Sequence, residues 1–209
     1  MSRTLAALLA ATAIATIGAN AGFAQQAPAG AAPDARTESP DARSRAQAIV
    51  ARMSIDEKIA LVHGLFPPLT KVTPPNALVP SAGHIEGNPR LGVPLVRESD
   101  ASLGVANQVE QRKGDVATAL PSSLATAATF DPEIARAGGA MNGAEARAKR
   151  FNVLLAGGVN LNRDPWGGRN FEYLGEDPLL AGELAGAHIA GVQSNKIVST
   201  IKHLSLIHI

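Results

Sequence analysis

The sequence contains no cysteine and few aromatic residues, and both absences exclude certain kinds of functional site. The 209 residues include no Cys, which excludes a disulfide framework, a thiol nucleophile and a zinc site built on Cys ligands. Aromatic residues make up only 3% of the chain. This low content argues against a long aromatic-lined groove for an oligosaccharide.

A large net charge is also lacking. Lys and Arg number 19 against 18 Asp and Glu, so the formal net charge is +1, and 45% of the residues are hydrophobic. Such a composition is typical of a soluble globular protein, and no basic patch indicates a nucleic-acid partner. The sequence contains no phosphate loop, dinucleotide fingerprint or metal-ligand cluster. We therefore expect no cofactor and no metal.

The apolar run near the N-terminus, residues 5–17, is too short to span a membrane comfortably. It follows Arg3 and precedes a stretch of small residues, which is the pattern of a secretory signal peptide over residues 1–24. Cleavage is expected after Ala24, with Ala21 as the alternative. The pattern predicts a periplasmic or secreted protein with no membrane contact after cleavage.

Residues 25–40 are rich in Ala and Pro without apolar periodicity, which predicts a linker before a folded part over residues 41–203. Two helices are expected at its start. One covers residues 41–53, and the next begins after the N-cap Ser54, has a Glu in the capping-box position and stops at Gly64.

Apolar strands then alternate with helices, which favours a parallel α/β architecture. The Pro- and Gly-rich segment 66–89 is expected to be an irregular connection. The expected strands cover 93–96, 152–161 and 197–203, and the expected helices cover 131–150, capped by Asp131, and 178–194, capped by Asp177.

The last helix has an apolar face that includes Leu184 and His188, so His188 is expected to be a packed core histidine. Gly182 and Gly186 in the same helix are expected to allow close packing against a neighbour.

Polar residues follow each predicted strand. Asp100 follows the first, the loop 163–176 the second, and Lys202 with His203 the third. In an α/β barrel the functional residues lie on the loops after the carboxyl ends of the strands. The pattern therefore predicts that these residues converge on one site.

The chain is shorter than a complete barrel, which takes roughly 250 residues, whereas the whole sequence has 209. The expected fold is therefore α/β, an incomplete (β/α)8 TIM-type barrel that comprises the N-terminal portion only. Residues 204–209 continue none of the patterns, and we expect them to be a non-native tail.

Four blocks resemble glycoside hydrolase family 3, whose typical members are β-glucosidases. In chain order they are "RLGVPLVRESDASLGV", "TALPSSLATAATFDPEIA", "GRNFEYLGEDPLLAG" and "IKH", and "ARMSIDEKIALVHG" is similar to the helix that precedes them in the family. The resemblance covers nearly all of the chain after the linker.

The resemblance implies that four residues bind a sugar. Asp100 would accept hydrogen bonds from two hydroxyls, and Arg169 would donate to a hydroxyl while it pairs with a carboxylate. Lys202 and His203 would bind the opposite edge of the same ring. Carboxylates and guanidinium forks suit the vicinal hydroxyls of a pyranose, and the implied substrate is a β-linked glucoside or short oligosaccharide.

The sequence departs from the family pattern at three places. After Asp100 the family usually has Gly-Pro and later an Arg, whereas this chain has Ala101, Ser102 and Ala106. The family's "RDPRWGR" is here "RDPWGGR", in which the Trp is displaced. After His203 the family's continuation is replaced by "LSLIHI".

The resemblance implies that the full-length protein is a secreted, exo-acting, retaining β-glycosidase that hydrolyses O-glycosyl bonds. In the family the nucleophilic Asp lies on a later barrel strand and the acid/base usually in a following domain. No catalytic residue is therefore assigned in this chain, and the chain alone is expected to be inactive. The alternatives are a non-catalytic periplasmic sugar-binding protein and a β-xylosidase or β-N-acetylglucosaminidase of the same family.

Structural roles compete with sugar binding at several of these positions. Glu172 is expected to pair with Arg169 and hold the loop. Trp166 has two open interpretations, stacking on a sugar face or packing under its own Gly-rich turn.

Overall fold

The structure is a computed structural model that describes residues 40–66, 82–107 and 110–203. The expected signal peptide 1–24 and the suspected tail 204–209 lie outside the described residues. Residues 1–44 and residues 45–209 form two separate compact units, and the site lies in the second. None of the helices in the described ranges is both long and apolar enough to cross a membrane.

Two helices open the described part, α1 (Pro40–Ala51) and α2 (Ile55–Leu61). The predicted capping box of α2 is present, because Ser54 Oγ accepts from the Glu57 amide and the Glu57 carboxylate accepts from the Ser54 amide. The helix ends at Leu61, earlier than the predicted stop at Gly64. There the Val62 amide bonds to the Ile59 carbonyl, a tighter closure that ends the last turn.

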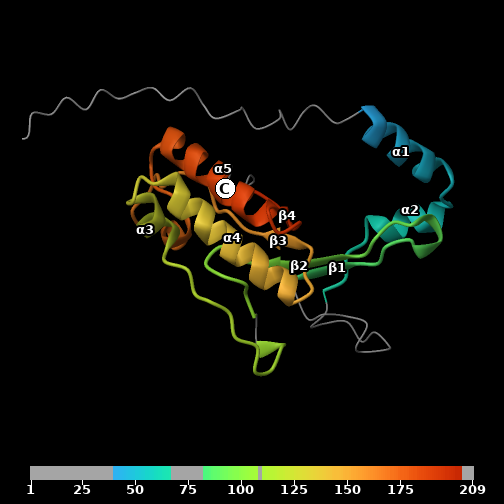
Figure 1. Ribbon diagram of the computed structural model, residues 1–209, viewed down its shortest axis with the longest axis horizontal. Helices are drawn as coiled ribbons and strands as arrows, with labels where there is room; N and C mark the ends of the chain where they lie inside the picture. The colour runs from blue at the N-terminus through green and yellow to red at the C-terminus, as the bar shows by residue number, and fades with distance from the viewer. Residues whose placement is uncertain (1–39, 67–81, 108–109, 204–209) are drawn as a thin grey trace, which may run out of the picture. The chain divides into compact units, whose positions relative to one another are not determined.

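The strands form one open sheet in the order β1 (Gly83–Ile85), β2 (Val96–Asp100), β3 (Val153–Leu155) and β4 (Val198–Ser199) (Figure 1). β1 is antiparallel to β2, and the β2–β3 and β3–β4 pairs are parallel. The α/β class is therefore confirmed, whereas the expectation of a parallel sheet was wrong for β1.

Two predictions about this sheet were wrong. β1 lies inside the segment that was expected to be irregular, because three residues are too few to show an alternating pattern. The first apolar strand was expected over 93–96, whereas β2 begins at Val96 and contains Arg97 and Glu98. Val93 instead bridges Asn88, and Pro94 has no amide to give to a ladder.

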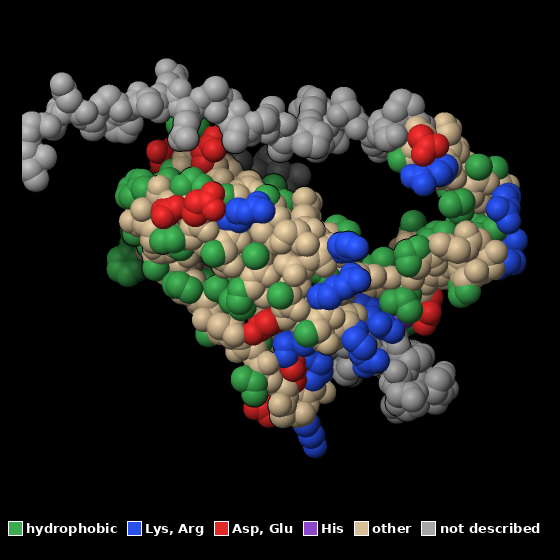
Figure 2. Space-filling view, viewed as in Figure 1, with side chains coloured by type: hydrophobic (Ala, Val, Ile, Leu, Met, Phe, Trp, Pro, Cys, Tyr) green, Lys and Arg blue, Asp and Glu red, His purple; other side chains and the backbone are tan. Residues whose placement is uncertain are grey.

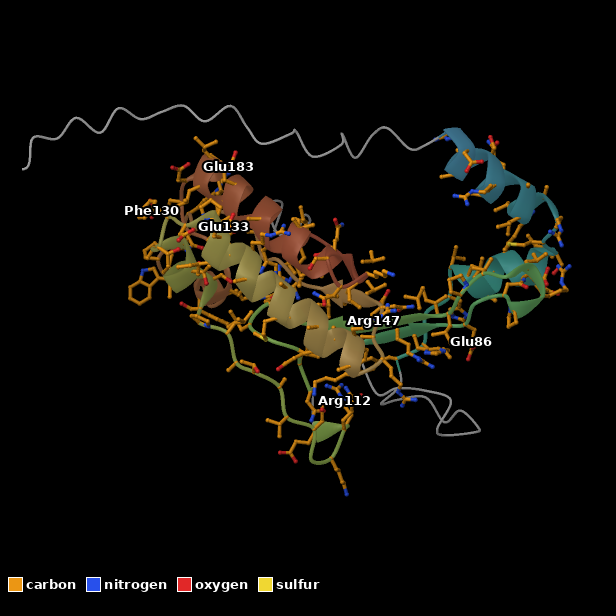
Figure 3. All side chains as sticks on the ribbon, in the orientation of Figure 1. Glu86, Arg112, Phe130, Glu133, Arg147 and Glu183 are labelled. Carbon is orange, nitrogen blue, oxygen red and sulfur yellow. The ribbon has the colours of Figure 1, made fainter. Side chains whose placement is uncertain are left out.

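Helix α4 (Pro132–Ala148) connects β2 to β3, and α5 (Pro178–Gln193) connects β3 to β4. Their predicted N-caps are confirmed, since Asp131 accepts from the Glu133 amide and Asp177 from the Leu179 amide. Figure 3 shows Glu133 at the first turn of α4 and Arg147 at its last, the charge signs that a helix dipole favours.

The remaining short helices are α3 (Ser123–Ala127) and the 3₁₀ turns η3 (Pro89–Leu91) and η5 (Asn170–Glu172).

Helices α4 and α5 lie side by side (Figure 1) and approach so closely that only glycine fits at their contact. A Cβ on Gly139 would lie 2.1 Å from the His188 carbonyl oxygen, and one on Gly191 would lie 2.2 Å from the Arg136 oxygen. Gly182 and Gly186, which were expected to make this contact, have nothing within 4 Å of a built Cβ. That prediction was wrong because α5 is apolar nearly all round, so its sequence distinguishes no single face.

The same helices cover one face of the sheet. Leu154 of β3 is fully buried in one cluster with Ala146 of α4 and Val192 of α5. Asn142 of α4, also fully buried, donates from Nδ2 to the Ala101 carbonyl at 2.7 Å, directly after β2. This bond ties the helix pair to the carboxyl end of a strand.

Figure 2 shows Lys and Arg side chains gathered near the C-terminal end of α4. There Asp115 pairs with Arg112 at 2.8 Å and with Lys149, and the Arg112 guanidinium lies 5.0 Å from the Phe151 ring centroid. Asp115 thus neutralises the positive charges of Arg112 and Lys149 within the fold, so these pairs do not indicate a binding site.

Candidate functional site

A polar pocket of about 640 Å³ lies where β3 and β4 end. Its walls come from the loop after β3 and from residues 201–203, and Arg169, Tyr173, Lys202 and His203 are among them. A second cavity of about 390 Å³ lies among α3, α4 and α5, and its lining is mainly apolar. A polyhydroxylated sugar needs many hydrogen-bond partners, so the polar pocket is the candidate site.

Strand pairing places Lys202 at this pocket. The parallel pairing of β3 and β4 continues through a bridge between Gly158 and Lys202, and the Lys202 amide donates to the Gly157 carbonyl at 3.2 Å. The Lys202 side chain then donates from Nζ to Asp100 Oδ1 at 2.9 Å. Asp100 is the last residue of β2, so this ion pair passes across the end of β3.

Arg169 is held on two sides. Its Nε donates to Glu172 Oε1, and its Nη2 lies 2.8 Å from His203 Nε2. The hydrogen bond that Arg169 donates to Glu172 raises the pKa of the Arg169 guanidinium. Glu172 is buried, whereas the Arg169 side chain is 49% exposed, so the carboxylate anchors the cation at the pocket edge. The expected pairing of Arg169 with Glu172 is confirmed.

His203 is fixed through both its backbone and its ring. Its amide donates to Asn160 Oδ1 at 2.6 Å, and Asn160 Nδ2 donates back to its carbonyl at 3.0 Å. Tyr173 Oη lies 3.3 Å from His203 Nδ1, and the two rings meet edge to face at 6.1 Å between centroids. Burial, and then the charges of Arg169 and Lys202, lower the pKa of His203, so the imidazole is neutral at pH 7.

The four residues that sequence reasoning selected thus meet in two pairs, Asp100 with Lys202 and Arg169 with His203. Three of them line the pocket, and Asp100 reaches it through Lys202. Sequence reasoning missed Asn160 and Tyr173. The one signal for Tyr173 was its rarity, since it is the only Tyr in the chain.

The displaced Trp of the loop lies in solvent. Trp166 is 91% exposed, so of its two open interpretations packing under its own turn was wrong, and stacking on a sugar face stays a prediction. The turn is closed instead by Asp164, whose Oδ1 accepts from the Trp166 amide at 2.9 Å and whose carbonyl accepts from Asn170 Nδ2 at 2.8 Å. These short polar bonds do not need the indole.

Within residues 40–66, 82–107 and 110–203, we find no group of three or more His, Asp or Glu side chains that could hold a metal ion.

Comparison with known proteins adds to this geometry. The model of the glycosyl hydrolase family 3 N-terminal domain matches residues 70–205. A probable β-glucosidase J of Aspergillus fumigatus is 36% identical over 156 residues, which are 75% of this chain and 16% of the relative. A β-glucosidase of Bacteroides ovatus is 42% identical over 127 residues, which are 57% of this chain and 17% of the relative.

Two solved structures are similar over about three quarters of the chain. β-Glucosidase 3B of Thermotoga neapolitana in complex with glucose has a TM-score of 0.68 and 34% identity, and the match covers 76% of this chain and 23% of that one. DesR, a β-glucosidase of Streptomyces venezuelae in complex with D-glucose, has a TM-score of 0.65 and 38% identity over 76% of this chain and 19% of that one. The chain thus spans less than a quarter of the length of these relatives.

Proposed function

Because the chain belongs to glycoside hydrolase family 3, we propose that its polar pocket forms one wall of the sugar-binding site of a retaining, exo-acting β-glucosidase. The substrate of the whole protein is a β-linked glucoside or a short oligosaccharide. The open sheet is the N-terminal portion of a (β/α)8 TIM-type barrel, and its carboxyl edge carries the site.

The observation that carries this proposal is the convergence of two polar pairs at that edge. Asp100 and Lys202 come from β2 and from the residues after β4, and they meet at 2.9 Å across the end of β3. Arg169 and His203 meet at 2.8 Å at the same pocket. A scattered set of surface charges has no reason to converge on one pocket at the ends of adjacent strands.

The four side chains offer both kinds of hydrogen bond that a pyranose needs. Arg169 and Lys202 are donors only, whereas the Asp100 carboxylate and a neutral His203 nitrogen accept. Each sugar hydroxyl both donates and accepts, so adjacent hydroxyls can be held by alternating partners. The existing pairs keep these groups hydrogen-bonded until a sugar replaces part of each bond.

The 209-residue chain itself binds sugar without hydrolysing it. Retaining hydrolysis needs two carboxyl groups about 5 Å apart, one as nucleophile and one as acid/base. Asp100 and Glu172 are each paired with a cation, Lys202 and Arg169. The pocket-lining Asp164 accepts from the Trp166 amide and closes its own turn. We therefore assign the catalytic pair of the whole enzyme to residues elsewhere in it.

The domain plan and location form part of the same proposal. Residues 1–24 are a signal peptide, 25–40 a linker, 41–203 part of the barrel domain and 204–209 a non-native tail. Cleavage after Ala24 delivers the protein to the periplasm or the medium. Mass spectrometry of the exported protein tests this proposal, and a mature chain that still begins at Met1 would contradict it.

A glucose titration tests the site directly. Calorimetry on the 209-residue chain should show binding that Arg169→Met weakens at least ten-fold, since a charged hydrogen-bond donor contributes roughly 1.5–3 kcal/mol. The control is Arg136→Met, which removes an exposed Arg of α4 away from the pocket. Equal affinities in the two variants would refute the assignment of the pocket.

An activity assay tests the proposal that the 209-residue chain does not hydrolyse its sugar ligand. The chain should release no nitrophenol from a nitrophenyl β-glucoside above the uncatalysed rate. Release that disappears in Asp100→Ala would show that the chain hydrolyses by itself.

A further inference from the structure

Arg169 determines which nitrogen of His203 carries the proton. A guanidinium has donors only, so His203 Nε2, which lies 2.8 Å from Arg169 Nη2, has to accept. A neutral imidazole carries one proton, and that proton must then sit on Nδ1. The group facing Nδ1 at 3.3 Å is the Tyr173 hydroxyl, which therefore accepts.

The neutral state of His203 agrees with its surroundings. Burial and the positive charges of Arg169 and Lys202 lower its pKa, and they outweigh the opposite effects of Glu172 and Asp100. The imidazole of His203 therefore carries a single proton, so one ring nitrogen donates a hydrogen bond and the other accepts one.

Tyr173 is itself held by the fold. It is 6% exposed, and its ring packs on Gly158, where an added Cβ would lie 3.0 Å from Tyr173 Cδ1. Gly158 takes part in the bridge that carries Lys202. The Tyr173 hydroxyl is thus held in a fixed position relative to the strand ends that carry the pocket.

We propose that Tyr173 is a positioning residue for His203. By accepting a hydrogen bond from Nδ1–H it holds the ring in place, so that Nε2, which Arg169 keeps unprotonated, faces the pocket as a hydrogen-bond acceptor. The role of this acceptor toward a sugar hydroxyl rests on the proposed function, but the tautomer itself does not.

The tautomer of His203 determines which hydrogen bonds the pocket can offer to a sugar. In the pocket Nε2 can accept from a sugar hydroxyl in place of Arg169, which frees the Arg169 donor for another oxygen of the sugar. With the other tautomer, Nε2 would carry a proton and meet the donor of Arg169 head-on, which would leave both donors without an acceptor.

Nitrogen-15 NMR of histidine-labelled protein tests the tautomer without any ligand. The chain has five His residues, so the His203 signals are assigned by their loss in His203→Gln. We expect Nδ1 of His203 to be protonated and Nε2 not at pH 7.5. The opposite pattern in the wild-type chain would overturn the proposal, and this measurement needs no destabilising variant.

Tyr173→Phe removes only the hydroxyl and keeps the packed ring. It should keep the tautomer that Arg169 imposes, shift the His203 Nδ1 signal because that N–H loses its acceptor, and weaken glucose binding roughly three- to ten-fold, the loss of one hydrogen bond. The control is Phe171→Leu, which changes the neighbouring half-exposed aromatic and should leave the His203 signals unchanged.

The outcomes separate the two proposals. If the wild-type chain shows the expected tautomer but binds no glucose, the proposed function fails and the positioning role stands. If glucose binds and Tyr173→Phe changes neither the Nδ1 signal of His203 nor the affinity, the positioning role fails and the sugar site stands.

Discussion

The α4–α5 contact lies over one face of the sheet and the polar pocket lies at the ends of β3 and β4, and the two regions are held together in opposite ways. At the helix contact, glycine lets backbone meet backbone, as at Gly139 against the His188 carbonyl. At the pocket, charged side chains meet in pairs, and half of the Arg169 side chain is in solvent. The helix contact depends on glycines that have no side chain, and the pocket depends on charged side chains that pair with each other.

This difference predicts where each kind of damage will show. A single added methyl group at the helix contact has no room, so it should cost stability. A lost side chain at the pocket removes a partly exposed ion pair, which contributes little to folding. It should cost binding instead.

The largest effect is expected for Gly139→Ala. Its Cβ would lie 2.1 Å from a backbone oxygen of α5, so the helices have to separate. We expect the free energy of unfolding to fall by about 3 kcal/mol, as measured by urea denaturation.

Gly186→Ala is the matched control in the partner helix. A Cβ there meets nothing within 4 Å, and Ala favours a helix over Gly by roughly 1 kcal/mol. The variant should therefore be slightly more stable than the wild type. Similar losses in both variants would show that the contact between the helices has been placed wrongly.

The second effect is expected at the pocket. Asp100→Ala removes the acceptor that holds Lys202, and glucose affinity should fall by about 2 kcal/mol in a calorimetric titration. Unfolding free energy should change by less than about 1 kcal/mol, since both side chains are partly exposed. Glu183→Ala, an exposed acid of α5, should change neither quantity.

The local signals in the sequence were sufficient for the helices and the class of fold. Capping residues act within one turn, so Ser54, Asp131 and Asp177 could be recognised from their neighbours in the chain. The limits of β2 could not, because they depend on pairing with β1 and β3. Which glycines of α5 contact α4 depends on the partner helix in the same way.

The site could be predicted only in part, for the same reason. The polarity of the strand ends indicated Asp100, Lys202 and His203, since parallel strands end at one edge. The partners that orient them were not visible. Tyr173 contacts His203 across 30 positions in the chain, and no short-range pattern encodes that contact.

A third variant joins the two regions. Asn142 belongs to α4, but its Nδ2 holds the carbonyl of Ala101, next to Asp100. Asn142→Ala leaves that buried carbonyl without its donor and should lower the free energy of unfolding by about 1.5 kcal/mol. We also expect weaker glucose binding, because the end of β2 loses its support. Unchanged binding at reduced stability would show that the helix pair and the pocket are independent.

The smallest expected effect is a pH dependence that differs between the helix contact and the pocket. His188 belongs to α5 and His203 to the pocket, and burial is the main cause that lowers the pKa of both. Each is harder to protonate in the folded chain than in the unfolded one, so the unfolded state binds more protons below the unfolded pKa of about 6.5. Stability is therefore complete above that pH and falls as the pH drops below it.

Only His203 should carry the pH dependence into binding, because a protonated ring cannot accept from a sugar hydroxyl or from Arg169. Between pH 7.5 and pH 5.5, glucose affinity should fall in the wild type and in His188→Gln alike. The loss of stability over the same range should be smaller in His188→Gln than in the wild type. If His188→Gln instead removes the pH dependence of binding, the helix contact controls the pocket, and the division between a structural helix contact and a binding pocket is wrong.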